Sequence, residues 1–342
     1  MSGTLSKRER VTAALAGLEL DRPPVAAWGH LLPFETDPAA LAAASLDAFH
    51  EYDWDWMKVN PRASVFAEAW GSEFDFGDYR GVLPRFLRNP IDPIDWGRLE
   101  PASTRHPVWA AHLEALRSIK RGIGGAPFVM TVFSPASVLA SLAGRPKELT
   151  QEGIGRANNE ALLALVRSRP DQAHHALGVI ADSLAELAAA SVAAGADGIF
   201  FAITRLARAG GLTEAEFESF GKPYDFRVLE AVAGAGFNLL HVCGPDIHWR
   251  AVQDYPVQAV NWASVGQGNP DLVQARAESR FALVGGLDEI GVLQNGTPEQ
   301  VRAATRRALE LGGRRKYLLA PGCCLDPSVP AANIRAFREA AA

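Results

Sequence analysis

The sequence predicts an α/β protein whose strands close into a single (β/α)8, or TIM, barrel. Eight short apolar runs are spread along its 342 residues, and sequence of helical character follows each of them. Strands that alternate with helices imply a parallel sheet, and eight such units favour a closed barrel. No Gly-x-Gly-x-x-Gly follows an early strand, so the rival open sheet with a dinucleotide crevice lacks support. We expect one barrel domain over residues 1–342.

The predicted strands are short runs of apolar residues, several of them bounded by proline or glycine. The first follows the stop at Asp21-Arg22-Pro23-Pro24, and the fifth contains the sequence His241-Val242-Cys243. In chain order the strands cover residues 25–28, 54–60, 127–133, 197–202, 237–243, 258–262, 281–286 and 316–320.

The predicted helices begin at capping residues or prolines. Ser6 and Glu9 have the spacing of a capping box, and Gly17 follows Ala16, the last residue of this first helix. Helices are expected over residues 6–16, 38–50, 106–121, in pieces over 136–195, over 213–220, 222–234, 297–311 and 330–341, with two more from Pro245 and Pro270.

Residues 61–105 have scattered proline, glycine and aromatic residues and no clear period. This stretch is long for a plain loop, so we expect an irregular insertion after strand two, either functional or built from small hairpins.

The composition is that of a soluble globular protein, with 48% hydrophobic and 21% charged residues. A net charge of −5 does not suggest a nucleic-acid binder. The N-terminus is charged from Lys7 and has no apolar signal core. The alanine-rich run over residues 176–196 contains Asp182 and Glu186, so we expect an amphipathic helix and not a membrane span. Three cysteines are too few for a disulfide framework and indicate reduced thiols in the cytoplasm.

All three cysteines lie at or just beyond the ends of predicted strands. His241 and Cys243 are two residues apart where the fifth strand ends, so both side chains should face the same side. Cys323 follows the eighth strand. We predict that these three residues are zinc ligands, because three ligands with one open position are typical of a catalytic site. The alternative is that they are packed core residues. Cys324 could replace a ligand, although neighbouring strand-end residues face apart.

The ligand set predicts the chemistry. One imidazole and two thiolates bring a Zn²⁺ site to zero net charge, which makes the ion a weaker Lewis acid toward water. Such a site can still bind a substrate thiol as a nucleophilic thiolate. We therefore expect alkyl transfer to sulfur in preference to hydrolysis.

Other side chains at predicted strand ends are candidates for contact with substrate. His30 and Asp288 are candidate catalytic residues, the alternatives being a packing histidine and a helix cap. The polar residues Lys58 and Asn60 end the second strand and could line the pocket, or be ordinary strand-end residues. Several tryptophans, among them Trp28 and Trp262, could line an apolar pocket or belong to the barrel core.

Motifs along most of the chain resemble the uroporphyrinogen decarboxylase superfamily. They are Lys7-Arg8-Glu9-Arg10-Val11, Asp21-Arg22-Pro23-Pro24-Val25, Ala194-Gly195-Ala196-Asp197, His241-Val242-Cys243-Gly244, Gly286-Leu287-Asp288 and Ala320-Pro321-Gly322-Cys323. The resemblance implies a (β/α)8 barrel. His-x-Cys together with Ala-Pro-Gly-Cys resembles the zinc-dependent methyltransferase branch, which moves methyl groups between a corrinoid protein and a thiol such as coenzyme M. That match implies that His241, Cys243 and Cys323 hold zinc.

Two other activities remain open. The decarboxylase branch has an arginine-rich segment where this chain has Ala26 to Pro33 without arginine, and a Gly-His-Gly where it has Gly322-Cys323-Cys324. A decarboxylase of a tetrapyrrole or another polycarboxylate would have no metal and a basic pocket. A non-catalytic corrinoid or porphyrin binder would bind a chromophore without turnover.

The resemblance also implies the partners. We expect a small thiol or methylated substrate and methylcobalamin carried on a separate corrinoid protein, since the sequence has no Asp-x-His-x-x-Gly of a cobalamin-binding domain. We expect no nucleic-acid or membrane partner. The direction of transfer and the oligomeric state are open.

Overall fold

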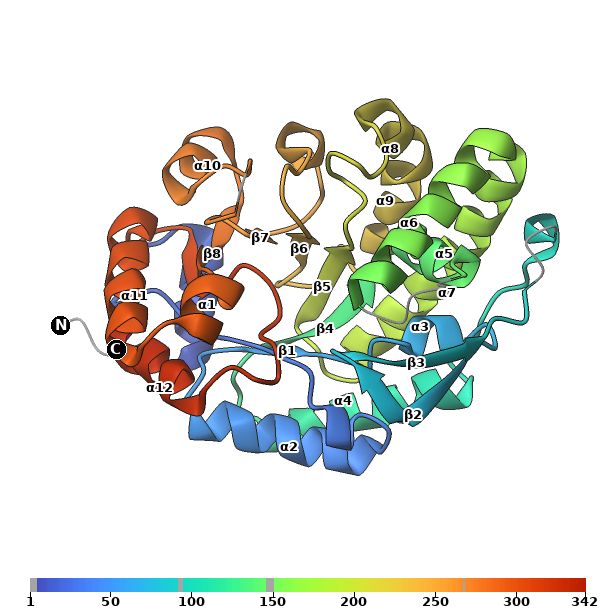
Figure 1. Cartoon of the computed structure of the whole chain (residues 1–342). Helices are drawn as coiled ribbons and strands as arrows, with labels where there is room; N and C mark the ends of the chain where they lie inside the picture. The colour runs from blue at the N-terminus through green and yellow to red at the C-terminus, as the bar shows by residue number, and fades with distance from the viewer. Residues whose placement is uncertain (1–4, 92–94, 146–150, 267) are drawn as a thin grey trace.

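The structure is a computed structural model that describes residues 5–91, 95–145, 151–266 and 268–342. Its centre is a curled sheet of seven parallel strands in the order β1-β4-β5-β6-β7-β8-β9, with helices around it (Figure 1). The strands are β1 (Met57–Val59), β4 (Phe128–Phe133), β5 (Gly198–Ile203), β6 (Leu239–Val242), β7 (Ala259–Trp262), β8 (Ala282–Leu287) and β9 (Tyr317–Pro321). This α/β architecture is compatible with a TIM-barrel-like fold.

The first predicted strand, residues 25–28, is not a strand of this sheet. Val25 forms only an isolated parallel bridge with Leu319 of β9. On its other side, the backbone N–H of Asp55 donates to the Val25 carbonyl at 2.9 Å. No ladder forms because the two preceding prolines have no N–H, and the N–H of Val25 donates to the Asp55 carboxylate at 2.8 Å. This segment therefore passes between β9 and the start of β1 without becoming a regular strand.

Helices cover the outside of the sheet, and most of those predicted are present. Ser6 and Glu9 form the expected capping box of α1, which ends at Gly17 in the left-handed conformation with φ 72°. The predicted helix from Pro245 is wrong, because only the short turn η3 follows there. The helices are α1 (Lys7–Ala16), α2 (Pro38–Glu51), α3 (Val65–Glu68), α4 (Pro107–Gly122), α5 (Pro135–Ala143), α6 (Gln151–Ser168), α7 (Pro170–Ala193), α8 (Glu214–Phe220), α9 (Lys222–Glu230), α10 (Leu272–Glu278), α11 (Pro298–Gly312) and α12 (Ala331–Ala340), with short turns η1 (Leu32–Phe34), η2 (Trp96–Arg98), η3 (Trp249–Val252) and the π-helical η4 (Glu289–Gln294).

The stretch predicted to be irregular, 61–105, contains regular elements in the part that the structure describes. After α3, the strands β2 (Glu73–Arg80) and β3 (Leu83–Arg88) pair in an antiparallel hairpin. This hairpin lies beside α3 at the edge of the molecule (Figure 1). Its register shifts twice, which explains why the sequence shows no clean alternation of apolar residues.

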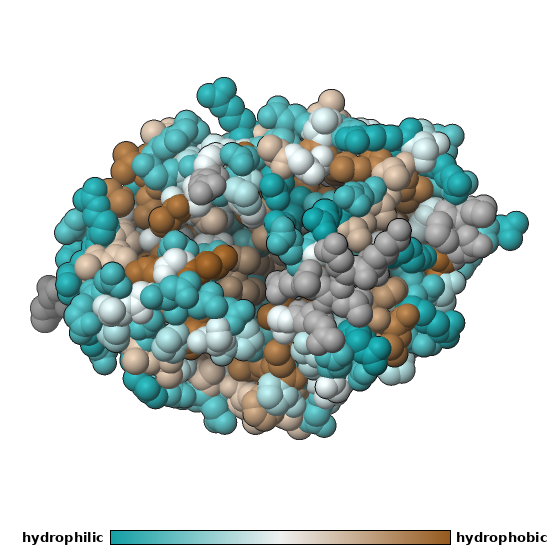
Figure 2. All heavy atoms as spheres, viewed as in Figure 1, coloured by the Kyte–Doolittle hydropathy of each residue, from teal (hydrophilic) through white to brown (hydrophobic). Residues whose placement is uncertain are grey.

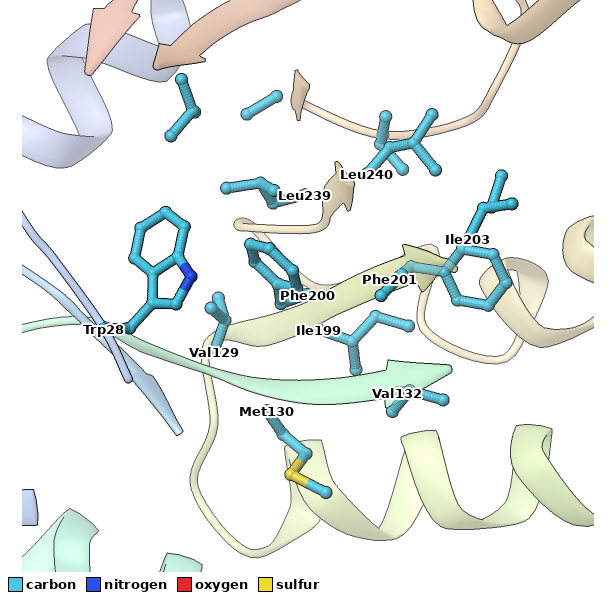
Figure 3. Packing of buried hydrophobic residues seen from close by; sticks show 14 of the residues in the cluster. Trp28, Val129, Met130, Val132, Ile199, Phe200, Phe201, Ile203, Leu239 and Leu240 are labelled. Carbon is cyan, nitrogen blue, oxygen red and sulfur yellow. The ribbon is translucent and has the colours of Figure 1, made fainter. Parts of the chain in front are cut away.

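Alternate residues of the strands face two different layers. Trp28, Val129, Phe200 and Leu239 lie on the inner side of the sheet, whereas Met130 of β4 points toward the helices (Figure 3). Both layers are buried, which explains why these strands read as continuous apolar runs. Figure 2 shows the molecule from the side seen in Figure 1, with a hollow near the middle of this face.

The N-terminal motifs form a buried ion network. The guanidinium of Arg10 donates to Asp21 at 2.7 Å and to Asp55 at 2.8 Å, and Arg22 donates to Asp55 at 2.5 Å. The Asp55 side chain is fully buried. The network therefore ties α1 and the loop after it to the residues that enter β1.

By length and composition, α7 is the one helix of the described residues that could cross a membrane. It packs instead against the sheet and other helices of this molecule, and Leu177, Ile180 and Leu184 on it are fully buried. These contacts are those of a helix in the core of the fold.

Candidate metal and substrate site

The three predicted metal ligands come together at the carboxyl end of the sheet. His241 lies on β6 and Cys243 directly follows this strand, so both side chains face its inner side. Cys323 follows β9 by two residues. The ligand atoms of the three residues all lie within 4.8 Å of one another, and His241 Nε2 is 3.7 Å from Cys323 Sγ. One nitrogen and two sulfurs at this spacing could hold a zinc ion.

Asn261 fixes the orientation of the His241 ring. It lies opposite His241 in the register of β6 and β7, and the two side chains bond at 2.7 Å between Nδ1 and Oδ1. The amide nitrogen of Asn261 donates to the carbonyls of Val284 and Pro321, so its oxygen is the acceptor and Nδ1 of His241 carries the proton. The lone pair of Nε2 is then free to bind a metal, as a hydrogen bond to the other ring nitrogen arranges in metal sites.

The surroundings favour the metal-binding form of Cys243, whereas in the absence of a metal they favour the protonated form of His241. Hydrogen bonding with Cys323 lowers the pKa of the Cys243 thiol; burial opposes this shift, and the charge of Arg205 supports it. A lower pKa increases the thiolate fraction, and the thiolate is the metal-binding form. Burial acts to lower the pKa of His241, but the hydrogen bond and charge of Cys323 outweigh it, so that pKa is raised.

A second polar group lies next to the metal ligands. Lys58 Nζ donates to the side-chain oxygen of Asn60 and lies 3.6 Å from Cys324 Sγ. The amide nitrogen of Asn60 donates to the carbonyl of Gly29 at 2.8 Å. Cys324 therefore contacts the second group, and its thiol also interacts with that of Cys323 in the first.

Lys58 is a buried cation without an acidic partner. Its Nζ lies 4.4 Å from the ring centre of Phe200 and 5.7 Å from that of Trp28, and no carboxylate of the described residues lies within ion-pair distance. Burial lowers the pKa of Lys58, against the opposing charges of Cys324 and Cys323. Phe200 also stacks on His241 with ring centres 5.2 Å apart, so it separates the two polar groups.

His30 lies at the edge of the second group. Its Nδ1 is 2.8 Å from Oε1 of Glu35, whose side chain is fully buried. Hydrogen bonding with Cys323 and burial raise the pKa of the Cys324 thiol, and the charges of Lys58 and His30 act against this shift. The structure thus places His30, Lys58 and Asn60 on one side of the barrel mouth.

Comparison with known proteins decides the family. The sequence model of uroporphyrinogen decarboxylase (URO-D) matches residues 6–342. The chain belongs to the uroporphyrinogen decarboxylase family. The resemblance that the sequence motifs indicate is therefore confirmed over nearly the whole chain.

Relatives of this family member include proteins named for two activities. It is 29% identical over 251 residues to the methylcobamide:CoM methyltransferase MtbA of Methanosarcina mazei, covering 71% of each chain. It is 24% identical to the uroporphyrinogen decarboxylase of a Synechococcus strain, covering 97% of this chain and 96% of that relative.

Solved structures show the same fold. A methyltransferase from Methanosarcina mazei superposes with a TM-score of 0.76 at 20% identity, covering 98% of both chains. A B12-independent methionine synthase from Shewanella sp. W3-18-1 superposes with a TM-score of 0.54 at 14% identity, covering 89% of this chain and 85% of the other.

Two predicted site residues lie elsewhere in this family member. Trp262 is fully buried, packs on Trp249 at 4.8 Å and donates its indole N–H to the carbonyl of Pro270. It faces away from the pocket because the preceding residue, Asn261, faces His241, and strand residues alternate. Asp288 caps η4, its carboxylate accepting the N–H groups of Ile290 and Gly291. Trp28, by contrast, lies inside, 5.5 Å from Phe200.

Three residues near the site escaped the sequence analysis. Asn261 could have been found from its place at the end of a strand beside the His-x-Cys strand. Nothing in the sequence indicates that Glu35 is buried, because its burial depends on the turn η1, which it directly follows. Glu289 lies close to Gly322 and to the charge of His241, and burial raises its pKa. The sequence motif in this region, Gly286-Leu287-Asp288, ends one residue before Glu289, so the sequence analysis did not single Glu289 out.

Proposed function

We propose that this family member is a zinc-dependent methyltransferase that moves a methyl group between a thiol and a corrinoid. The convergence of His241, Cys243 and Cys323 within 4.8 Å carries this proposal. A methylcobamide:CoM methyltransferase among the relatives supports an enzyme of this class. A porphyrinogen decarboxylase is expected to have a cluster of arginines at its substrate site. The segment from Ala26 to Pro33 contains no arginine, and the cation of the second polar group is a lysine, Lys58.

His241, Cys243 and Cys323 would hold the zinc ion, and Asn261 would keep Nε2 of His241 available to it. Zinc with one imidazole and two thiolates has no net charge and supplies a position where a substrate thiol can be held as a thiolate. Phe200 and Trp28 form an apolar wall beside this position. Such a wall excludes water, which leaves a thiolate less solvated and more nucleophilic.

The name of the relative supplies candidate substrates. We propose coenzyme M or a similar small thiol as methyl acceptor, and methylcobalamin on a separate corrinoid protein as donor, with the reverse direction equally available. The enzyme would act in the cytoplasm. We also propose that residues 24–29 take the place of an eighth strand, so that the chain forms a single closed barrel.

The test is the metal content of protein purified without chelator, measured by plasma mass spectrometry. We expect about one zinc per wild-type chain, because three protein ligands suffice for a catalytic site. Cys243→Ala should lose the zinc. Cys324→Ala is the matched control and should keep it, since Cys324 is not one of the three residues whose ligand atoms all lie within 4.8 Å of one another.

Wild-type protein with zinc should then demethylate methylcobalamin in the presence of coenzyme M or another small thiol. Wild type without zinc, even after zinc is supplied, would contradict the proposal and favour the decarboxylase activity of the other relatives. Equal zinc in wild type and Cys243→Ala would contradict the ligand assignment.

A further inference from the structure

A buried ammonium group beside the proposed metal ligands has no counter-charge. Lys58 on β1 is 7% exposed, and none of the carboxylates that the structure describes forms an ion pair with it. A charge that is taken out of water is costly unless an opposite charge or several hydrogen bonds offset it. This side chain is therefore a place where an anionic ligand would be favoured.

The hydrogen bonds of Lys58 do not use all of its donors. Nζ donates to Oδ1 of Asn60 and lies 3.6 Å from Sγ of Cys324, a weak acceptor. An ammonium group has three N–H donors, so at least one is left. The rings of Phe200 and Trp28, on the inner side of the sheet in Figure 3, have their centres 4.4 Å and 5.7 Å from Nζ. These rings attract the cation but do not carry the negative charge that would balance it.

One thiol and one ring separate Lys58 from the proposed ligands. Cys324 contacts Lys58, and its thiol also interacts with that of Cys323. Phe200 packs against both Lys58 and the ring of His241, whose centre is 5.2 Å from its own. Cys323 and Cys324 are partly exposed, so solvent reaches this side of the ligands. One small molecule can therefore contact both the ligands and Lys58.

A bound zinc ion would increase the need for a counter-charge. Burial lowers the pKa of Lys58, and the charges of Cys324 and Cys323 act against this shift. The negative charge of Cys323 would be neutralised when it holds Zn²⁺ together with Cys243 and His241, because two thiolates balance the charge of the ion. Lys58 would then lose part of the charge that offsets its own. An anionic group on the bound thiol would replace it.

The other cations near the ligands are more exposed or already paired. Arg205 is exposed, and exposed charges are solvated by water. Arg208 is partly exposed, although its Nε is buried without a partner in the described part of the chain. His30 has the carboxylate of Glu35 beside it, 2.8 Å from Nδ1. Lys58 differs from all three because the whole residue is buried and no carboxylate pairs with it.

We propose that Lys58 binds an anionic group, a sulfonate or a carboxylate, on the thiol substrate and so selects anionic thiols over neutral ones. The inference rests on the proposed function and names the class of substrate at the same site. Oδ1 of Asn60 accepts from both Lys58 and Thr131, and its amide nitrogen donates to the carbonyl of Gly29. These bonds hold the ammonium group in place before a substrate binds.

The test compares the binding of anionic and neutral thiols by calorimetry, a readout that does not depend on turnover. The probes are coenzyme M, which carries a sulfonate, mercaptopropionate, which carries a carboxylate, and mercaptoethanol, which is neutral. Zinc-loaded wild type should bind each anionic thiol at least about 10-fold more tightly than mercaptoethanol, because hydrogen bonds between charged groups are the strong ones.

Lys58→Met should abolish this preference. It keeps the length of the side chain and removes its charge, and apolar residues often replace buried charges without loss of stability. Its affinity for the two anionic thiols should fall about 10-fold, while its affinity for mercaptoethanol and its zinc content should equal those of wild type. An equal loss of affinity for all three thiols would indicate a structural role alone and would overturn the inference.

Two further variants remove cations at other positions. Arg208→Gln removes the main rival cation and should keep the full preference for anionic thiols. Lys120→Met makes the same substitution at an exposed lysine of α4 and should behave as wild type. A preference that disappears in Arg208→Gln and survives in Lys58→Met would assign the anionic group to Arg208 and contradict the inference.

A competitor without a thiol keeps the test valid if Lys58→Met does not fold. Ethanesulfonate has the anionic group of coenzyme M and lacks its sulfhydryl, so it should compete with coenzyme M for wild type when sodium chloride keeps the ionic strength constant. Failure to compete, or equal affinity of wild type for charged and neutral thiols, would overturn the inference while the proposed function stands. If zinc-loaded wild type binds none of the three thiols, both fall.

Discussion

The buried carboxyl of Asp225 on α9 shows how one side chain can control stability. Tyr255 donates to its Oδ2 at 2.5 Å, and Oδ1 has no partner among the described residues. Burial raises the pKa of Asp225 to about 8, although the bond from Tyr255 acts the other way. The folded protein therefore keeps a proton there that the unfolded chain would release near pH 4.

Wild-type stability should fall as pH rises because of Asp225, and Asp225→Asn should abolish this fall. Between about pH 4 and pH 8 the folded state binds more protons than the unfolded state, so wild-type stability falls as pH rises. We expect the free energy of unfolding of the variant, relative to wild type, to increase by at least about 1 kcal/mol from about pH 5 to pH 8. Urea denaturation at several pH values measures it. Parallel pH profiles would show that Asp225 ionises normally in the folded state.

At the scale of elements, the ion network around Asp55 joins three segments of the chain. The pattern of hydrophobic residues in the sequence does not predict that these segments meet. Arg10 lies on α1, Arg22 in the following loop, and Asp55 just before β1. Asp55 also accepts the N–H of Val25, in the segment that lies beside β9. The Asp55 carboxylate thus accepts a backbone hydrogen bond that Val25 would otherwise donate to a neighbouring strand.

Asp55→Asn should destabilise the protein by about 3 kcal/mol. The buried Arg10 pairs with two carboxylates, Asp21 and Asp55, and the substitution removes the charge of one of them. The measurement is chemical denaturation at neutral pH. Glu51→Gln removes a carboxylate from an ion pair with Arg335 in which both side chains are about half exposed, and it should cost less than about 1 kcal/mol. Equal effects of the two changes would mean that the network does not hold α1 in place.

At the scale of the whole molecule, the candidate metal site joins two distant parts of the sheet. β6 supplies His241 and the residue after it is Cys243, while the turn after β9 supplies Cys323, with β7 and β8 lying between them. A ligand that binds this arrangement only in the folded state stabilises the entire fold by mass action.

Removal of metal should therefore lower the melting temperature of the wild-type protein. Zinc returned to the chelated protein at about 100 times its dissociation constant should stabilise it by about 2.7 kcal/mol. Cys243→Ala should show no such gain. A thermal shift titration follows both proteins, with Cys324→Ala as a control that should respond as wild type does. The same zinc response in Cys243→Ala would indicate binding elsewhere.

Local patterns in the sequence determined much of this protein. The apolar runs fixed most strands of the parallel sheet, and the Ser6–Glu9 capping box with Gly17 fixed the bounds of α1. His-x-Cys at a strand end predicted two side chains on one side, because strand residues alternate. The motifs also indicated the family, which the match over residues 6–342 confirms.

Tertiary structure alone decided what these residues meet. Register between β6 and β7 placed Asn261, not Trp262, beside His241. Asp55 turned the first predicted strand into an isolated bridge, and the turn η1 buried Glu35 against His30. A period in the sequence tells which residues share a face, since that depends on neighbours along the chain. It does not tell which side chains meet across strands, because those partners lie far apart in the sequence and only the packed fold brings them together.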